Sequence, residues 1–444
     1  MLGRSRTVPA LRIASGRYRF RESLFALPTV VVIGGAVLAE ATAFVDRVTV
    51  GGLAIPLTVR MNSNAATWLL STVAGATITT AGVVFSLTVV SLQLASSQFS
   101  PRVMRSFIRD RVSQLVIGLL VATFVFCVLA LRHVSADPAA NAPPLQMTFA
   151  IVLTLTTVLL IIGYLNRLAH GLQVGEVVRA ISKEADHVLE ATTREARAEE
   201  PALEEAGEPS DDRLVVRAGT SGWVTQAPSK YILAAVPPST VVRLETRTGA
   251  YIHRGEVLMS AWPMPEDPER TRARLLATVE VADIRTMQYD VDFGIRQLVD
   301  IALRALSAAI NDPTTATEVV LRLGSLLRDI LVSELPLVSV RGPHGRTLLR
   351  PWILSHDEYI EHAFDPIRQA AVTQIHVVTA LLRVLQMLID HVVGAGRTEH
   401  VPALRAQITL LMDAVAARTD IHADDLARLR AIAEDTDPAE HDLR

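Results

Sequence analysis

The chain has 444 residues, of which 50% are hydrophobic and only 5% aromatic, and its formal net charge is −3 at pH 7. Apolar content this high, supplied mainly by aliphatic residues, is typical of membrane spans and argues against a purely soluble enzyme. The small net charge gives no reason to expect a nucleic-acid partner. The single cysteine, Cys127, excludes a disulfide framework and a cysteine-based metal site.

Four apolar stretches in the first 170 residues predict four membrane-spanning helices. A span needs about 20 apolar residues, because each residue adds about 1.5 Å toward about 30 Å of hydrocarbon. The second stretch is longer than a bilayer requires and is expected to continue beyond it. In chain order the stretches are Leu24–Phe44, Ala65–Gln98, Leu115–Leu131 and Met147–Leu165.

The basic residues near the ends of these stretches predict the orientation in the membrane. Thirteen of them flank one side of the membrane and three flank the other side. Cytoplasmic loops carry the excess of Arg and Lys. We therefore expect a multi-pass protein of the bacterial inner membrane with both termini in the cytoplasm. A cleaved signal peptide over residues 1–43 is the alternative, and the long basic region before the first stretch argues against it.

Beyond residue 170 the composition becomes mixed and predicts a cytoplasmic α+β region. Val174–Ala198 predicts an amphipathic helix, and the acidic run that follows it is expected to be a solvated linker. Leu214–Trp262 predicts short strands, including Tyr231–Ala235, because Gly, Pro and Ser interrupt its β-branched and aromatic residues. The spacing G-x-x-I-x-x-G-x-x-L in Gly249–Leu258 is typical of the hairpin of barrel-sandwich domains. No lysine stands at its tip for a carrier function, so we interpret it as a scaffold.

From Arg285 onward, apolar residues recur every three or four positions and predict helices with one apolar face. The first of these helices is expected to continue to Asn311. Asp312 is a suitable N-cap and Pro313 a suitable first residue for the next helix, which is expected to end near Leu331.

Ser355 and Glu358 have the spacing of a capping box and predict the start of a further helix. A restart is expected at Asp365-Pro366, from which the helix would run to Val393. Two shorter helices are predicted to close the chain.

Together these elements predict a mainly α membrane protein with a four-helix transmembrane domain and a cytoplasmic α+β region. The α+β region is expected to contain a small β unit like a barrel-sandwich, followed by a helical bundle. The expected domains are a four-span domain over residues 1–170, a helical and acidic linker over 171–212, a small β domain over 213–265 and a helical domain over 266–444.

Two segments carry a family resemblance. One is Ser91–Arg102, at the end of the second span, and the other is Phe293–Ala316. They resemble the bacterial family of predicted membrane proteins called domain of unknown function 2254. The resemblance extends from the first span to the helix after Phe364, although Ala308 stands where many relatives have a proline. It implies an integral membrane protein with a cytoplasmic C-terminal region and carries over no functional residue. Within the second segment we single out five residues as its structural signature: Asp300, Arg304, Asn311, Asp312 and Pro313.

Hydroxyl and amide side chains interrupt the second apolar stretch far more often than the other three. Lipid leaves such groups dependent on carbonyls of their own helix, so we expect this span to line a pathway or the centre of a homo-oligomer. Tight helix packing is the alternative, because Ser71, Gly75 and Thr79 form a small-xxx-small track. The pore-lining candidates are Thr77, Thr80, Ser86, Thr88, Ser91, Gln93, Ser97 and Gln98, with Arg102 at the inner mouth, where it would favour anions.

Ionisable residues elsewhere give further candidates. Glu40 lies near the outer end of the first span, where it is either a functional group at membrane depth or an interfacial residue. The best metal candidate is the group His356, Asp357, Glu358, Glu361 and His362. Glu358 and His362 share a helical face with a spacing that suits a metal, but capping already explains Glu358 and no metal is expected. Asp300 with Asp312 is a candidate carboxylate pair that a salt bridge and a helix cap also explain.

No phosphate-binding glycine loop, nucleophile elbow or HExxH motif is present, so neither an enzyme nor a cofactor is expected. Two classes of function remain. One is an oligomeric channel or transporter for ions or small solutes, with the second span lining the pathway. The other is a membrane-anchored cytoplasmic sensing or scaffolding module that its spans only tether to the lipid bilayer.

Overall fold

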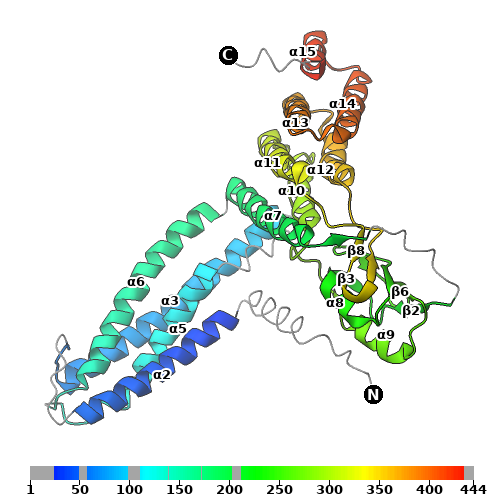
Figure 1. Ribbon diagram of the computed structural model, residues 1–444. Helices are drawn as coiled ribbons and strands as arrows, with labels where there is room; N and C mark the ends of the chain where they lie inside the picture. The colour runs from blue at the N-terminus through cyan, green and yellow to red at the C-terminus, as the bar shows by residue number, and fades with distance from the viewer. Residues whose placement is uncertain are drawn as a thin grey trace. The chain divides into compact units, whose positions relative to one another are not determined.

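The computed structural model describes residues 25–49, 58–98, 111–138, 140–171, 173–202 and 212–434. The chain divides into two compact units. We call residues 15–173 the N-terminal unit and residues 174–444 the C-terminal unit. In its described part the N-terminal unit is built from long helices, whereas the C-terminal unit combines helices with two sheets (Figure 1).

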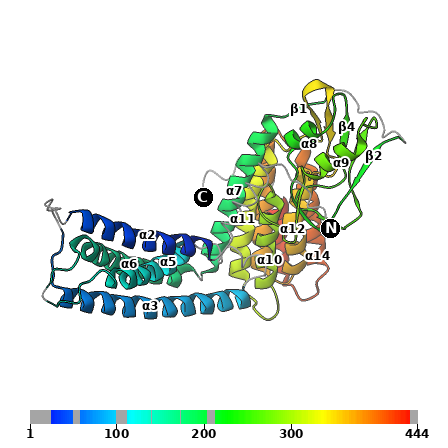
Figure 2. The same ribbon diagram turned by 90° about the horizontal axis from the view of Figure 1, so that it is seen from below.

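Four apolar helices build the described part of the N-terminal unit. They are α2 (Ala26–Thr49), α3 (Ser63–Gln98), α5 (Arg111–Leu131) and α6 (Pro144–Gly171). Helix α5 lies between α2 and α3 (Figure 2). Half of the residues in its most apolar 18-residue stretch are buried, against 22–28% in the other three helices. The outer faces of α2, α3 and α6 therefore expose mostly apolar side chains, as is expected of helices that contact lipid.

Polar contacts fix one end of this bundle. The carboxylate of Asp46 near the end of α2 accepts hydrogen bonds from the backbone N–H groups of Leu145 and Gln146, both at 3.1 Å. A carboxylate at a helix N-terminus satisfies unpaired N–H groups and interacts favourably with the helix dipole. The N–H of Ser63 at the start of α3 donates to the carbonyl of Ala140 at 2.8 Å. The starts of α3 and α6 are thereby held together.

A fifth helix, α13 (Ile375–Gly394), is also long and apolar enough to span a membrane, so hydropathy alone gives five candidates where the sequence predicted four. Helix α13 belongs to the C-terminal unit, where it packs against α11 (Pro313–Val332), α12 (His356–Ala371) and α14 (Val401–Ala416). There, 56% of the residues in its most apolar 18-residue stretch are buried.

The remaining long helices of the C-terminal unit are α7 (Val174–Arg197), α10 (Val291–Ala305) and α15 (Ala423–Glu434). Helix α7 confirms the predicted amphipathic helix and packs its buried face against α10 and α11. The sequence predicted that this helix continues to Asn311, but α10 ends at Ala305. A turn follows, in which the N–H of Asp312 donates to the carbonyl of Ala305 at 2.8 Å.

The predicted restart at Pro366 is also wrong. Helix α12 continues through Pro366, and the chain breaks later, so that α13 begins after Gln374. Proline lacks an N–H and removes one helical hydrogen bond. Its neighbours Phe364 and Ile367 are fully buried, and this packing explains why the helix continues.

Two open sheets form the β part of the C-terminal unit, and the described residues contain no closed barrel, which corrects the predicted barrel-sandwich-like unit. The larger sheet has the order β1–β8–β9–β4–β6–β2, in which only the β4–β9 pair is parallel. The smaller sheet has the order β5–β3–β7. The strands are β1 (Glu200–Pro201), β2 (Leu214–Arg217), β3 (Gly222–Gln226), β4 (Val241–Leu244), β5 (Tyr251–Ile252), β6 (Val257–Trp262), β7 (Glu280–Ala282), β8 (Ser339–Arg341) and β9 (Thr347–Leu349).

The Gly249–Leu258 segment does not form the predicted hairpin. Strand β5 pairs with β3 while β6 pairs with β2 and β4, so the two strands belong to different sheets. Gly249 and Gly255 do have positive φ angles of 83° and 90°, which glycine adopts without steric cost. The glycine spacing therefore predicted the turns correctly and the strand pairing wrongly.

The predicted strand Tyr231–Ala235 is part of a short helix, α8 (Ser229–Ala235). Its side chains Ile232, Leu233 and Ala235 are buried in the core of the sheet region. A short apolar run cannot be assigned to helix or strand by its periodicity alone. A further helix, α9 (Pro268–Leu276), adds Leu275 to the same core.

Candidate functional site

The polar residues of α3 divide between two faces of the helix. On the buried face, Thr77 is 6% exposed and its hydroxyl donates to the carbonyl of Val73 at 2.8 Å. Thr88 donates in the same way to Val84 and lies 2.8 Å from the hydroxyl of Tyr164 on α6. These two pore candidates are thus used for packing within one chain.

The opposite face of α3 is exposed and carries small and polar residues among apolar ones such as Trp68 and Val89. Positions three or four apart share a helical face, and this spacing places them in one stripe. A methyl group built onto Gly75 or Gly82 would meet no atom within 4 Å, so the surface there is open. We call this face the α3 stripe, and its members are Ser71, Gly75, Thr79, Gly82, Ser86 and Gln93.

The other pore candidates lie between these faces or outside the described part. Thr80 and Ser91 are half-buried, and their hydroxyls donate to carbonyls of their own helix at 2.8 and 2.9 Å. The side chains of Ser97 and Gln98, and the whole of Arg102, lie outside the described residues.

Glu40 projects from α2 with 55% of its side chain exposed, and its carboxylate lies 3.9 Å from Nε2 of His133. Helix α2 continues to Thr49, so Glu40 lies further from the helix end than the sequence indicated. The amide nitrogen of Gln146 donates to the carbonyl of Ala39 and lies 3.3 Å from Nδ1 of His133. Because that nitrogen is a donor, Nδ1 accepts, and neutral His133 carries its proton on Nε2, toward Glu40.

The signature residues around residue 312 shape a helix boundary. Asp312 is the N-cap of α11, as predicted, and accepts hydrogen bonds from the backbone N–H of Thr315 at 3.0 Å and from its hydroxyl. These bonds stabilise the charged carboxylate and lower the pKa of Asp312. Asn311 has a positive φ of 49° and accepts a hydrogen bond from Gln374 at 2.8 Å. Asp300 and Arg304 are half-buried on α10.

A buried charge network at the start of α10 was not predicted from the sequence. Arg285 donates to Asp290 at 2.7 Å and to Asp292 at 2.7 Å, and Asp290 is also the N-cap of α10. His362 on α12 lies 2.7 Å from the other oxygen of Asp292. Hydrogen bonds from His362 and Arg285 outweigh burial and lower the pKa of Asp292.

The side chains of the candidate metal site around Glu358 and His362 contact separate partners. His362 contacts Asp292, whereas Nε2 of His356 lies 3.1 Å from the carbonyl of Ser333. Glu358 closes the predicted capping box with Ser355. Among the described residues, no group of three or more His, Cys, Asp or Glu side chains is arranged to hold a metal ion.

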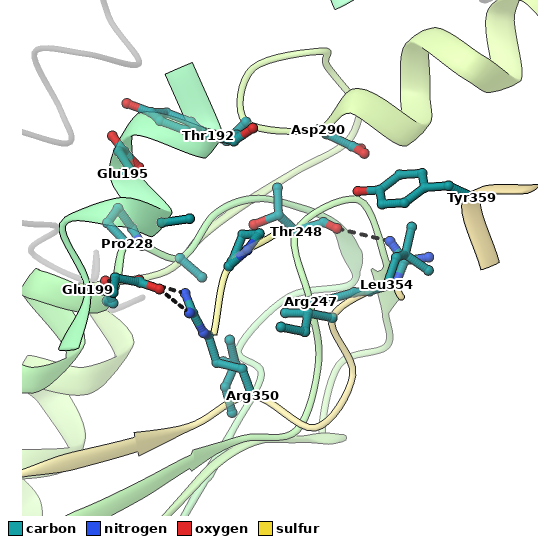
Figure 3. Close-up of a pocket in the computed structure, with 17 residues that line it drawn as sticks. Thr192, Glu195, Glu199, Pro228, Arg247, Thr248, Asp290, Arg350, Leu354 and Tyr359 are labelled. Carbon is teal, nitrogen blue, oxygen red and sulfur yellow. Dashed lines mark hydrogen bonds and ion pairs between the residues drawn. The ribbon is translucent and has the colours of Figure 1, made fainter. Parts of the chain in front are cut away.

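A cavity of about 140 Å³ opens where α7, the sheets and α12 meet in the C-terminal unit (Figure 3). Its apolar wall includes Pro228 and Leu354. Tyr359 and Arg247 lie on one side, and Glu195 and Glu199 lie on the other side (Figure 3). No sequence motif marked this cavity, because its lining comes from well-separated segments of the chain.

One corner of the cavity is held by a buried ion pair. Arg350 contacts both oxygens of Glu199, and the two side chains are only 10% and 11% exposed. Ser229 and the backbone N–H of Leu337 also donate to this carboxylate, at 2.8 and 3.2 Å. The acidic run after α7 was expected to be solvated, so Glu199 corrects that prediction. A single-sequence pattern gives no sign of a partner so far along the chain.

Comparison with known proteins agrees with the family resemblance of the segments Ser91–Arg102 and Phe293–Ala316. The model of the family described as "Predicted membrane protein (DUF2254)" matches residues 21–387. Uncharacterized proteins of Mycobacterium bovis and Mycobacterium tuberculosis are each 32% identical over 382 residues, which is 84% of this chain and 72% of theirs. No solved structure matches. The chain belongs to the DUF2254 family of predicted membrane proteins.

Proposed function

We propose that the protein is an oligomeric inner-membrane protein in which the α3 stripe faces other copies of the chain around a pathway for ions or small solutes. The observation that carries this proposal is the exposure of Thr79, Ser86 and Gln93 on the face of α3 opposite to Thr77. Hydroxyls can bond back to their own helix, as Thr79 does to Gly75 at 2.8 Å. Gln93 lies about 45 Å along α3 from Ser63 at about 1.5 Å per residue, so its amide is at or beyond the inner edge of about 30 Å of hydrocarbon, where it would line the mouth of the pathway.

Four spans, α2, α3, α5 and α6, are part of this proposal. Helix α13 is excluded from the count because it is the most buried of the five candidates, within the C-terminal unit. The excess of basic residues near one side of these spans supports an orientation with both termini in the cytoplasm. With 36 residues, α3 rises about 54 Å at about 1.5 Å per residue and extends beyond about 30 Å of hydrocarbon.

Cysteine cross-linking in native membranes tests the interface. In a Cys127→Ala background, Ser86→Cys should form a disulfide-linked dimer under mild oxidation, because equivalent stripes would meet near an axis. Leu159→Cys is the matched control, since Leu159 on α6 is 70% exposed but lies among apolar neighbours. Equal cross-linking at both positions, or none at Ser86→Cys, would contradict the interface.

Planar-bilayer recordings test the pathway itself. Purified protein should conduct, and Gln93→Leu should change the current, while Leu159→Ala should not. Arg102 follows α3 in the sequence, and Arg102→Gln is expected to reduce the preference for anions. A monomeric particle that passes no current in several salts would favour the tethered sensing or scaffolding module.

A further inference from the structure

The polar groups that line the cavity of the C-terminal unit are of two kinds: some already have enough hydrogen-bond partners among the described residues, and others do not. Glu199 is saturated by Arg350, Ser229 and a backbone N–H. Among the described residues, Asp290 accepts three hydrogen bonds, two from Arg285 and one from the backbone N–H of Phe293 at 3.2 Å. Because all or most of their lone pairs are occupied, these two carboxylates form the walls of the cavity and have little capacity left for a ligand.

Two hydrogen-bond donors on one side of the cavity lack such partners. The half-buried guanidinium of Arg247 donates to the carbonyl of Thr248 at 3.1 Å, and no carboxylate among the described residues lies within 4.0 Å of it. A guanidinium has five N–H donors, so most of those of Arg247 remain available. The hydroxyl of Tyr359 forms no hydrogen bond within the described parts of the chain.

Arg247 and Tyr359 come from different elements and act on the same space. Arg247 follows β4 and Tyr359 lies on α12, and both line the cavity. Burial, with Asp290 and Asp292 nearby, raises the pKa of Tyr359. Its hydroxyl therefore stays protonated at neutral pH and remains a donor. In Figure 3 the hydroxyl end of Tyr359 points into the cavity above Arg247.

We propose that this cavity binds a small organic carboxylate, held by Arg247 and Tyr359, with its hydrocarbon body against the apolar wall. A guanidinium presents N–H donors in a planar fork that matches a carboxylate, and the hydroxyl supplies a further donor. Drug-sized ligands occupy roughly 300–1,000 Å³, which exceeds the cavity of about 140 Å³. A cavity of roughly 150 Å³ holds a molecule of the size of benzene, so a four-carbon acid fits.

The opposite side of the cavity sets the preferred net charge of the ligand. Glu195 has no ion-pair partner within 4.0 Å among the described residues, and Figure 3 places it across the cavity from Tyr359. Burial raises the pKa of Glu195, while the positive charge of Lys230 favours its carboxylate form. A second negative charge at that end would be repelled, whereas an ammonium would be attracted. The site therefore prefers a monoanion or a zwitterion to a dianion. This inference does not depend on the oligomer or on a conducting pathway.

Calorimetric titration of the full chain in detergent tests the site with four probes that share a four-carbon body. We expect butyrate and 4-aminobutyrate to bind, succinate to bind more weakly and butylamine not to bind. Arg247→Gln should weaken butyrate binding by roughly tenfold or more, because it removes a charge-assisted hydrogen bond. Tyr359→Phe should weaken butyrate binding less than Arg247→Gln does. Glu195→Gln should reduce the difference in affinity between 4-aminobutyrate and succinate.

Arg254→Gln and Tyr251→Phe are matched controls on the exposed surface of the same unit and should bind like the unaltered chain. Thermal unfolding without ligand shows whether each variant is folded. Absence of heat with every carboxylate at millimolar concentration would overturn the proposal. Equal binding of butylamine and butyrate, or butyrate binding unchanged in folded Arg247→Gln and Tyr359→Phe, would overturn it as well.

Discussion

In the N-terminal unit, Thr77 on α3 donates to a carbonyl four residues earlier in the same helix, whereas in the C-terminal unit Glu199 is held by Arg350, which lies 151 residues further along the chain. The first contact forms wherever the helix forms. The second forms only when the whole unit is folded. Thr77 is therefore satisfied locally, whereas tertiary structure satisfies Glu199. We expect substitution of a buried residue that is held by a distant partner to be far more costly than substitution of one that bonds within its own helix.

The largest effect is expected at the buried ion pair. Arg350→Met should lower the free energy of unfolding by about 3 kcal/mol, because it leaves the carboxylate of Glu199 buried without its counter-charge. Denaturant titration of the full chain in detergent, followed by tryptophan fluorescence, measures the loss. The exposed pair of Arg179 and Glu176 is the control, and Arg179→Met should cost less than about 0.5 kcal/mol. Similar losses in both variants would remove the contrast between buried and exposed pairs.

A helix cap should give an intermediate effect. Asp312→Ala should lower the free energy of unfolding by about 1 kcal/mol, while Asp312→Asn should retain most of the stability because asparagine also caps well. The pKa of Asp312 is below its ordinary value of 3.8 in the folded chain. Its contribution is therefore fully present above that pH and is lost as the pH falls through the lowered pKa. Denaturant titrations at pH 6 and pH 3 should show the cost of Asp312→Ala shrinking in acid, and a constant cost would show that the carboxylate charge contributes nothing.

The smallest effects are expected in the spans. Thr88→Val removes the contact with Tyr164 and should cost about 0.6 kcal/mol, the average for a hydrogen bond between membrane helices. Thr77→Val should cost less, because the hydroxyl of Thr77 bonds only within its own helix. Unfolding in mixed micelles of increasing dodecyl sulfate content measures both. A loss of several kcal/mol at either threonine would show that tertiary contacts, and not local ones, satisfy the polar groups of the spans.

Sequence patterns predicted the elements that depend on local chemistry. The apolar stretches correspond to α2, α3, α5 and α6, because a continuous apolar run is a local property of the chain. The caps at Asp312 and Ser355 were predicted for the same reason, since each depends on residues within one turn. Even the glycine turns at Gly249 and Gly255 were correct.

Features that depend on distant partners were not predicted. The pairing of β5 and β6 was wrong because the choice of neighbouring strand is decided by the whole sheet. Glu199 was assigned to a solvated run because its partner, Arg350, lies in a segment with no distinguishing pattern. The cavity was missed for the same reason, since its donors Arg247 and Tyr359 are adjacent only after folding.

The parallel pairing of β4 with β9 has a consequence for biosynthesis. Strand β4 ends at Leu244, and its partner begins only at Thr347. Ribosomes add about 5–20 residues per second, so the edge of β4 waits for several seconds before β9 is available. An unpaired strand edge attracts other chains. The nascent protein must therefore be shielded during this interval, and crowded or chaperone-poor expression hosts should yield aggregates that involve β4.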